Sequence, residues 1–151
     1  APISNQPQYS ILRRGIEVEV LPVCEREGLG QLVFSPLAQG VLTGKYSGGA
    51  LPAGTRAADS FRNQFMRAFL EPEALARVDA LRPIAAELGV SLAQLALAWC
   101  LRRPGVASVI VGATRAAQLE DNAKASGLEL PAEIAARIDA ISPPPHAPAG
   151  V

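Results

Sequence analysis

The stretch 105–122, GVASVIVGATRAAQLEDN, carries the clearest structural signal in the chain. It opens with Val106–Val111, in which four of six residues are β-branched, a composition typical of a strand buried on both faces of a parallel sheet. Gly112 then ends the strand, and Thr114 is placed to cap a helix. Because the free N–H groups of a helix start attract anions and the planar fork of Arg115 matches a phosphate, the stretch predicts a phosphate site.

Composition limits the classes of protein to consider. The chain has 151 residues, long enough for one domain with a core, and 14 basic residues balance 14 acidic ones, which argues against a nucleic-acid or anionic-membrane partner. The longest apolar run, Leu95–Leu101, is too short to span a membrane. Cys24 and Cys100 are too few for a disulfide framework and are expected to be reduced core residues of a cytoplasmic protein. His146 has no partner at ligand spacing, so no metal site is expected.

Alternating strand and helix signals predict a parallel sheet. Short apolar runs predict strands that end near Gln6 and Phe34, in addition to the strand that ends before Gly112. Apolar residues at helical spacing predict helices over 16–28 with a bend or late start at Pro22, 72–89 with a kink or a split at Pro83, 92–102 capped by Ser91, and 131–141. Since parallel strands place their carboxyl ends at one edge, the polar residues that follow the three strands are expected to meet there.

Local sequence alone leaves the role of these polar residues open. Thr114 and Arg115 fit an ordinary helix cap and a solvated charge as well as they fit a phosphate site, and Phe34 fits a core position. Residues 47–60, rich in Gly, Pro, Ala and Ser, predict a long loop, and loops of that length in compact domains are usually functional.

Three segments in chain order resemble the aldo-keto reductases, most closely the subgroup that contains bacterial reductases and potassium-channel β-subunits. They are Asn5-Gln6-x-x-Tyr9, residues 34–46 (FSPLAQGVLTGKY) and residues 112–122 (GATRAAQLEDN). The resemblance implies an α/β fold comprising the C-terminal three βα units of a (β/α)8 TIM barrel plus a terminal helix, not a complete barrel. The partial domain is expected over residues 1–141, followed by a proline-rich disordered tail over 142–151.

The same resemblance implies a binding site for NADPH. Gln6 is expected to bond the nicotinamide carboxamide, and Phe34 to stack on the nicotinamide ring. The pyrophosphate is expected to lie against Ser35, Pro36, Leu37, Ala38 and Gly40. Lys45 and Arg56 are expected in a loop that closes over the phosphates. The adenosine with its 2′-phosphate is assigned to Gly112, Thr114, Arg115 and Gln118, and the adenine to Asp121 and Asn122.

The family's catalytic Asp, Tyr, Lys and His have no counterparts here, because they come from strands that precede the matched segments. Tyr9 and Tyr46 do not match the proton-donor motif. The resemblance therefore implies a reductase of aldehydes and ketones, acting by hydride transfer from NADPH, in which this chain alone is inactive. One alternative is an NADPH-binding regulatory subunit of the channel β-subunit type. The other is a truncated product without function, whose open edges require the N-terminal part of the barrel or self-association.

Overall fold

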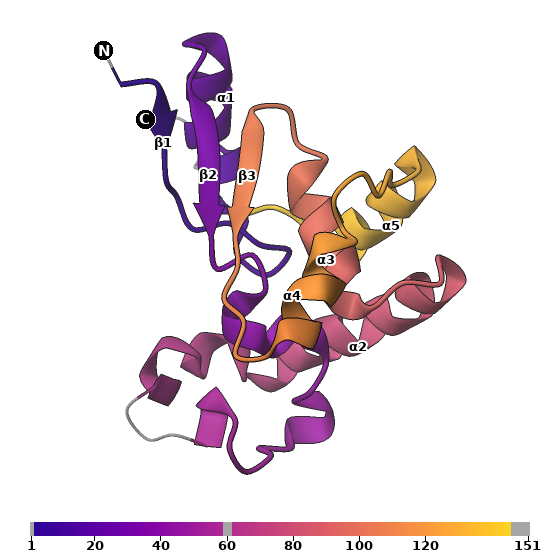
Figure 1. The fold of residues 1–151 in the computed structure, drawn as a ribbon. Coiled ribbons are helices and arrows are strands. Elements are labelled where there is room, and N and C mark those ends of the chain that lie inside the picture. Colours follow the sequence, from indigo (N-terminus) through magenta and orange to yellow (C-terminus); the bar gives the residue numbers. More distant parts are fainter. Residues whose placement is uncertain (1, 59–61, 146–151) are drawn as a thin grey trace.

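The computed structural model describes residues 2–58 and 62–145, and its centre is a three-stranded parallel sheet in the order β1-β2-β3 (Figure 1). The strands are β1 (Ser4–Asn5), β2 (Gly30–Phe34) and β3 (Val106–Ile110). Ser4 pairs with Gly30 across the first ladder, and Phe34 pairs with Ile110 across the second. The parallel sheet predicted from the sequence is therefore confirmed.

Helices connect and cover the strands. Helix α1 (Val20–Arg26) lies between β1 and β2, and helices α2 (Pro72–Glu87) and α3 (Leu92–Leu101) lie between β2 and β3. Helices α4 (Ala116–Ala123) and α5 (Ala132–Ile141) follow β3. Short 3₁₀ turns occupy Gly15–Glu17, Ala38–Thr43, Ser47–Gly49, Arg56–Ala58, Arg62–Phe65 and Arg67–Phe69. The described residues form a mixed α/β unit with a small parallel sheet, not a closed barrel.

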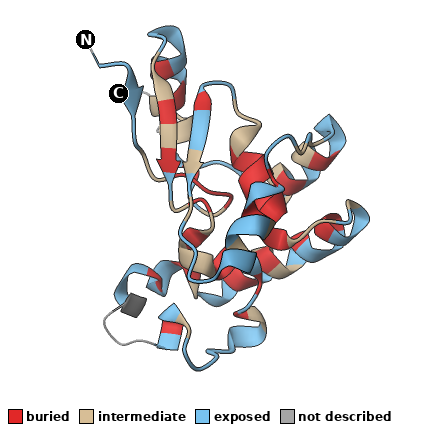
Figure 2. Ribbon diagram, in the orientation of Figure 1, coloured by how far each residue is buried: buried red, intermediate tan, exposed pale blue. Residues whose placement is uncertain are grey.

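Helix α3 is the central element of the core. Its sequence is apolar on nearly every side, and all its residues from Leu92 to Cys100 are buried, as the red colour of α3 in Figure 2 shows. The helix begins with the predicted capping box: the Ser91 hydroxyl accepts from the Gln94 N–H, and the Gln94 side chain accepts from the Ser91 N–H.

Pro22 and Pro83 affect their helices differently. Helix α1 starts late, at Val20, with Pro22 in its first turn, where the missing N–H removes no helical bond. Helix α2, in contrast, runs unbroken through Pro83, so the sequence expectation of a split at this residue is wrong. Only one helical hydrogen bond is lost at Pro83, and the buried side chains of α2 hold both halves against the core.

The burial of β3 differs from the sequence expectation. Of its residues only Val106 is buried, whereas Ala107, Ser108 and Ile110 are exposed. The expectation of a strand buried on both faces is therefore wrong for the described residues: α3 packs against β3 but leaves most of its side chains uncovered.

The carboxyl-terminal boundary also differs. Ser142 is buried, and its hydroxyl donates to the Ile11 carbonyl at 2.6 Å. The packed unit thus includes Ser142, the first residue of the expected tail. Residues 146–151, including His146, lie outside the described residues.

Within the ranges 2–58 and 62–145, no single helix is both long and apolar enough to cross a membrane. Helices α2 and α3 satisfy a length and composition test only as a pair, bent by 91°.

Candidate functional site

The carboxyl ends of the three strands lie at one edge of the sheet, beside the loops that follow them (Figure 1). The Phe34 N–H donates to the Pro7 carbonyl at 3.0 Å, and the Tyr9 N–H donates to the Phe34 carbonyl at 3.3 Å. Since Phe34 also pairs with Ile110, the residues after β1, β2 and β3 are neighbours at this edge. Phe34 itself is 40% exposed, which is unusual for phenylalanine and leaves part of the ring available to a ligand.

The loop after β2 has an uncommon backbone. Ser35, Ala38 and Gln39 have φ values of 57°, 48° and 59°, a left-handed conformation that side chains with a Cβ seldom adopt. Such residues cost about 1 kcal/mol or more each and cluster at ligand sites. Turn bonds hold the loop: the Ala38 N–H donates to the Ser35 carbonyl at 2.9 Å, and the Gly40 N–H donates to the Leu37 carbonyl at 2.9 Å.

Gln39 links this loop to a cationic side chain. Its Nε2 donates to the Ser35 hydroxyl, and its Oε1 accepts from the Arg56 guanidinium. The loop after β2 and the segment that carries Arg56 are therefore joined through one amide. Gln39 was not selected from the sequence, because it is a variable position within the matched segment 34–46.

Lys45 occupies the space beside Gly40. A Cβ added to Gly40 would lie 3.1 Å from the Lys45 Nζ and 3.3 Å from its Cε. Gly40 also has a φ of 94°, so both conformation and space favour glycine. Lys45 is exposed, and its ammonium lies 5.2 Å from the ring centroid of Tyr46. The structure thus places two predicted residues, Gly40 and Lys45, against each other.

The region after β3 is open to solvent, but its helix starts differently from the prediction. Helix α4 begins at Ala116 with Arg115 at its N-cap, and no side chain caps it. The prediction that Thr114 caps the helix is therefore wrong. Instead, the Gln118 Oε1 accepts from the Thr114 N–H at 2.9 Å and from the Thr114 hydroxyl at 3.1 Å. Gly112, Thr114 and Arg115 are all exposed.

Asp121 and Asn122 both contact other parts of the protein. The Asp121 carboxylate accepts from the Ser91 hydroxyl at 2.8 Å and from the Gln94 Nε2 at 2.6 Å, which joins α4 to the capping box of α3. Asn122 is buried. The assignment of both residues to an adenine site remains a prediction.

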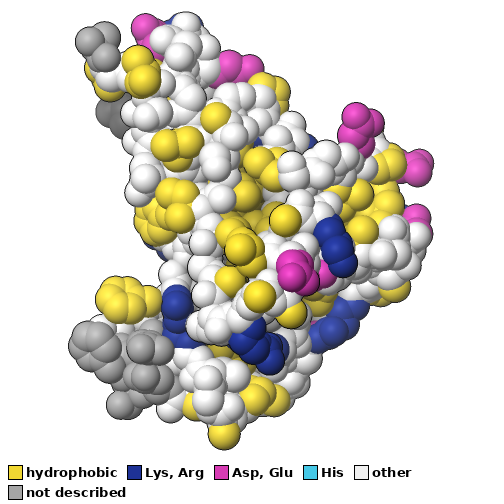
Figure 3. Space-filling model, viewed as in Figure 1, with side chains coloured by type: hydrophobic (Ala, Val, Ile, Leu, Met, Phe, Trp, Pro, Cys, Tyr) yellow, Lys and Arg dark blue, Asp and Glu magenta, His cyan; other side chains and the backbone are white. Residues whose placement is uncertain are grey.

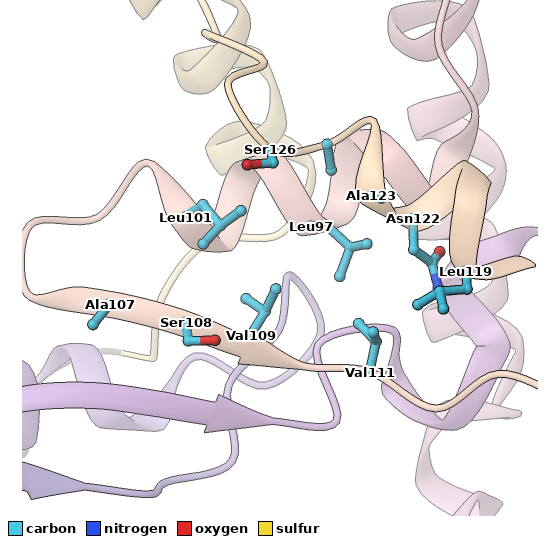
Figure 4. Close-up of a pocket in the computed structure, with 11 residues that line it drawn as sticks. Leu97, Leu101, Ala107, Ser108, Val109, Val111, Leu119, Asn122, Ala123 and Ser126 are labelled. Carbon is cyan, nitrogen blue, oxygen red and sulfur yellow. The ribbon is translucent and has the colours of Figure 1, made fainter.

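An apolar cavity of about 280 Å³ lies between β3, α3 and α4 (Figure 4). Leu97 and Leu101 line it from α3, Val109 from β3, and Leu119 and Asn122 from α4. Asn122 is the only predicted site residue among its lining residues. The cavity therefore borders the start of the loop after β3 through Val111, but none of its lining residues comes from the loops after β1 and β2.

Charged and hydrophobic side chains occupy different parts of the surface seen in Figure 3. Figure 3 shows an indented outline between the strand ends and the described turns that follow β2, with Lys or Arg side chains along the indentation. Hydrophobic side chains gather over the sheet and the cavity beside it.

Neither tyrosine is available as an acid at this edge. Tyr9 and Tyr46 are both fully buried. The Tyr9 hydroxyl donates to the Glu17 carboxylate at 2.6 Å, and burial together with this carboxylate raises the pKa of Tyr9.

Burial likewise raises the pKa of the Cys100 thiol. In the part of the chain that the structure describes, no three His, Cys, Asp or Glu residues are grouped to hold a metal ion.

Comparison with known proteins identifies related sequences over nearly the whole chain. A family model described as "Aldo/keto reductase family" matches residues 1–143. A probable voltage-gated potassium channel subunit beta of Arabidopsis thaliana is 48% identical over 126 residues, which is 82% of this chain and 38% of that protein. Protein tas of Escherichia coli is 40% identical over 139 residues, covering 92% of this chain and 39% of that protein. An L-glyceraldehyde 3-phosphate reductase of Escherichia coli O157:H7 is 39% identical over 142 residues, covering 89% of this chain and 40% of that protein. The chain spans about two fifths of the length of each.

Proposed function

Because the chain belongs to the aldo/keto reductase family, we propose that it forms the last three βα units of a (β/α)8 barrel and carries most of an NADPH site. Its three strands are parallel, and the loops at their carboxyl ends lie where α/β proteins bind their ligands, which supports this placement. The share of its relatives that it spans, 38% to 40%, also agrees with such a part.

The loop after β2 fits a diphosphate. The observation that carries the proposal is the pair Gly40 and Lys45, in which the ammonium group lies against the backbone of Gly40, 3.1 Å from where a Cβ of that residue would be. Arg56 reaches the same loop through Gln39 and adds a second cation. Small residues and left-handed backbone let a phosphate approach the main chain closely, and the two cations offset its charge.

The neighbouring loops supply the other contacts. Phe34 offers an exposed ring face for the nicotinamide, and Gln6 follows the adjacent strand with an exposed amide for the carboxamide. Arg115 is exposed beyond the end of β3 and is suited to the 2′-phosphate that distinguishes NADPH from NADH. When bound, NADPH supplies a hydride for the reduction of a carbonyl group; the residues of this chain bind the cofactor and orient it.

The proton needed by a carbonyl reduction does not come from a tyrosine of this chain. Tyr9 and Tyr46 are buried, and Tyr9 is committed to Glu17. The chain by itself is therefore expected to bind NADPH without reducing aldehydes or ketones, and the small carbonyl substrate belongs to the complete enzyme.

A second candidate is a regulatory subunit that binds NADPH without depending on turnover. The identities of 48% and 49% to two probable channel β-subunits favour it. The two candidates differ in one test: in the complete protein, removal of the proton donor abolishes the function of a reductase but not that of a cofactor-sensing subunit.

Titration of the chain with NADPH and NADH, followed by cofactor fluorescence, tests the proposal. Arg115→Gln is expected to weaken NADPH binding about tenfold, because a phosphate loses its cationic partner, and to leave NADH binding unchanged. Arg26→Gln, which changes an exposed arginine on α1, serves as the matched control. Equal effects of Arg115→Gln on both cofactors would contradict the role of Arg115, and the absence of NADPH binding by the unaltered chain would contradict the proposal.

A further inference from the structure

The segment Gly44–Ser47 presents one cationic side chain from a fixed backbone. Gly44 and Tyr46 are buried, whereas Lys45 between them is exposed, with its ammonium beside Gly40. The backbone that carries Lys45 is therefore anchored on both sides of the residue, which limits the positions that its ammonium group can reach.

Helix α2 supplies the polar anchors. The Arg82 guanidinium donates to the Gly44 carbonyl at 2.7 Å and to the Ser47 hydroxyl. The Ser47 hydroxyl donates to the Asp79 carboxylate at 2.5 Å, and the Arg82 Nε donates to the same oxygen at 3.0 Å. Two residues one turn apart on α2 thus bind the residues on both sides of the Lys45–Tyr46 pair.

The steric fit around Gly44 makes this anchoring specific. Gly44 has a φ of 77°, and a Cβ there would lie 2.7 Å from both the Arg82 terminal nitrogen and a methyl group of Leu92. The backbone therefore lies directly against the guanidinium. The hydrogen bonds of Ser47 and Arg82 also lower the pKa of Asp79, so the carboxylate stays ionised at neutral pH.

We infer that Asp79 and Arg82 are positioning residues, which hold the backbone around Lys45 so that its ammonium group is preorganised to meet a phosphate at the loop after β2. The inference rests on the proposed NADPH site. A fixed cation binds an anion more tightly than a flexible one, because less conformational entropy is lost on binding. The hydrogen bonds of Asp79 and Arg82 to this part of the chain go to Gly44 and Ser47 and not to the turn 35–40, so each acts through Lys45.

A double-mutant cycle on NADPH affinity tests the coupling. Lys45→Met is expected to weaken binding about tenfold, and Asp79→Asn about fivefold. If Asp79 acts through Lys45, the double variant binds no more weakly than Lys45→Met alone. Glu73→Gln is the matched control, because Glu73 forms an ion pair with Arg77 on the same helix at 2.6 Å, away from the anchored segment.

Limited trypsin digestion tests the anchoring without cofactor. Cleavage after Lys45 requires its backbone to leave the anchored conformation, so Asp79→Asn is expected to accelerate this cleavage several-fold, and Glu73→Gln to leave it unchanged. Mass spectrometry of the peptides separates this cut from cuts at other lysines and arginines. If Asp79→Asn does not fold, Ser47→Ala removes the same contact from the other side and replaces it in both experiments.

The outcomes separate the two proposals. Additive losses of affinity, or cleavage after Lys45 that does not change in Asp79→Asn, would overturn the positioning role. If the unaltered chain does not bind NADPH, the proposed function fails, and the digestion alone then decides whether Asp79 anchors the segment.

Discussion

At the scale of single residues, Gly44 is the most constrained glycine among the described residues. We expect Gly44→Ala to lower the free energy of unfolding by about 2 kcal/mol or more, since it adds a strained φ and displaces Arg82 from the Gly44 carbonyl. Gly49→Ala has a similar φ of 76° with open space around it and is expected to cost about 1 kcal/mol. Urea denaturation measures both variants, and equal losses would show that the contacts with Arg82 and Leu92 contribute nothing.

Residue roles could be predicted from the sequence only where the chemistry is local. The role of Gly40 against a pyrophosphate stays a prediction, whereas its contact with Lys45, five positions away, depends on the folded turn. Thr114 was expected to cap a helix, yet its hydroxyl binds Gln118 because α4 begins later. Gln39 was not predicted at all, since its function depends on Arg56, which the chain brings near only after folding.

At the scale of elements, Ser91 joins two helices. Its hydroxyl caps α3 and also donates to Asp121 on α4. Ser91→Ala is therefore expected to lower the free energy of unfolding by about 1 to 2 kcal/mol. Thr55→Ala, which removes a hydroxyl that donates to the Pro52 carbonyl in an exposed turn, is the control and is expected to cost less than about 0.5 kcal/mol. A loss no greater than that of the control would contradict the role of the capping box.

Elements with a strong local pattern were predicted correctly, and elements whose surroundings decide their burial were not. Helix α3 has a capping box and an apolar sequence, and its helical state follows from these alone. Strand β3 has an equally apolar sequence, but its exposure depends on which elements lie beside it, and this information is absent from the strand. Pro83 predicts a kink or a split of α2, and of these two the split does not occur, because tertiary contacts of the buried side chains keep the helix continuous.

At the scale of the whole molecule, one carboxylate joins three distant parts of the chain. Asp139 on α5 accepts from Arg14 at 2.9 Å, from Arg102 at 2.8 Å and from the Trp99 indole at 3.1 Å. The two guanidinium carbons lie 4.9 Å and 4.7 Å from the Trp99 ring centroid. The loop after β1, the end of α3 and α5 are thereby held in one arrangement.

This network is expected to stabilise the molecule more than an exposed ion pair between α2 and α5. Asp139→Asn should lower the free energy of unfolding by about 2 kcal/mol, because Arg14 is 5% exposed and loses a charged partner. Glu87→Gln breaks the pair with Arg137, in which the side chains are 51% and 47% exposed, and should cost about 0.3 kcal/mol. Urea denaturation of both variants measures the difference, provided that the slope of the unfolding free energy against urea concentration is the same in both. Similar losses would show that burial does not strengthen the Asp139 network.

The segment between Ser47 and Arg56 is tied to the molecule at both ends, by Asp79 at one end and by Gln39 at the other. Residues 48–54 between these ties are exposed throughout. The entropic free-energy cost of closing a flexible loop rises by only about 0.6 kcal/mol for each doubling of its length. Lengthening the segment is therefore expected to weaken the contacts at its two ends only slightly. Protein engineers therefore have a natural insertion point here, where a peptide tag or a fluorescent reporter between Gly49 and Gly54 would lie beside the candidate site without entering the core.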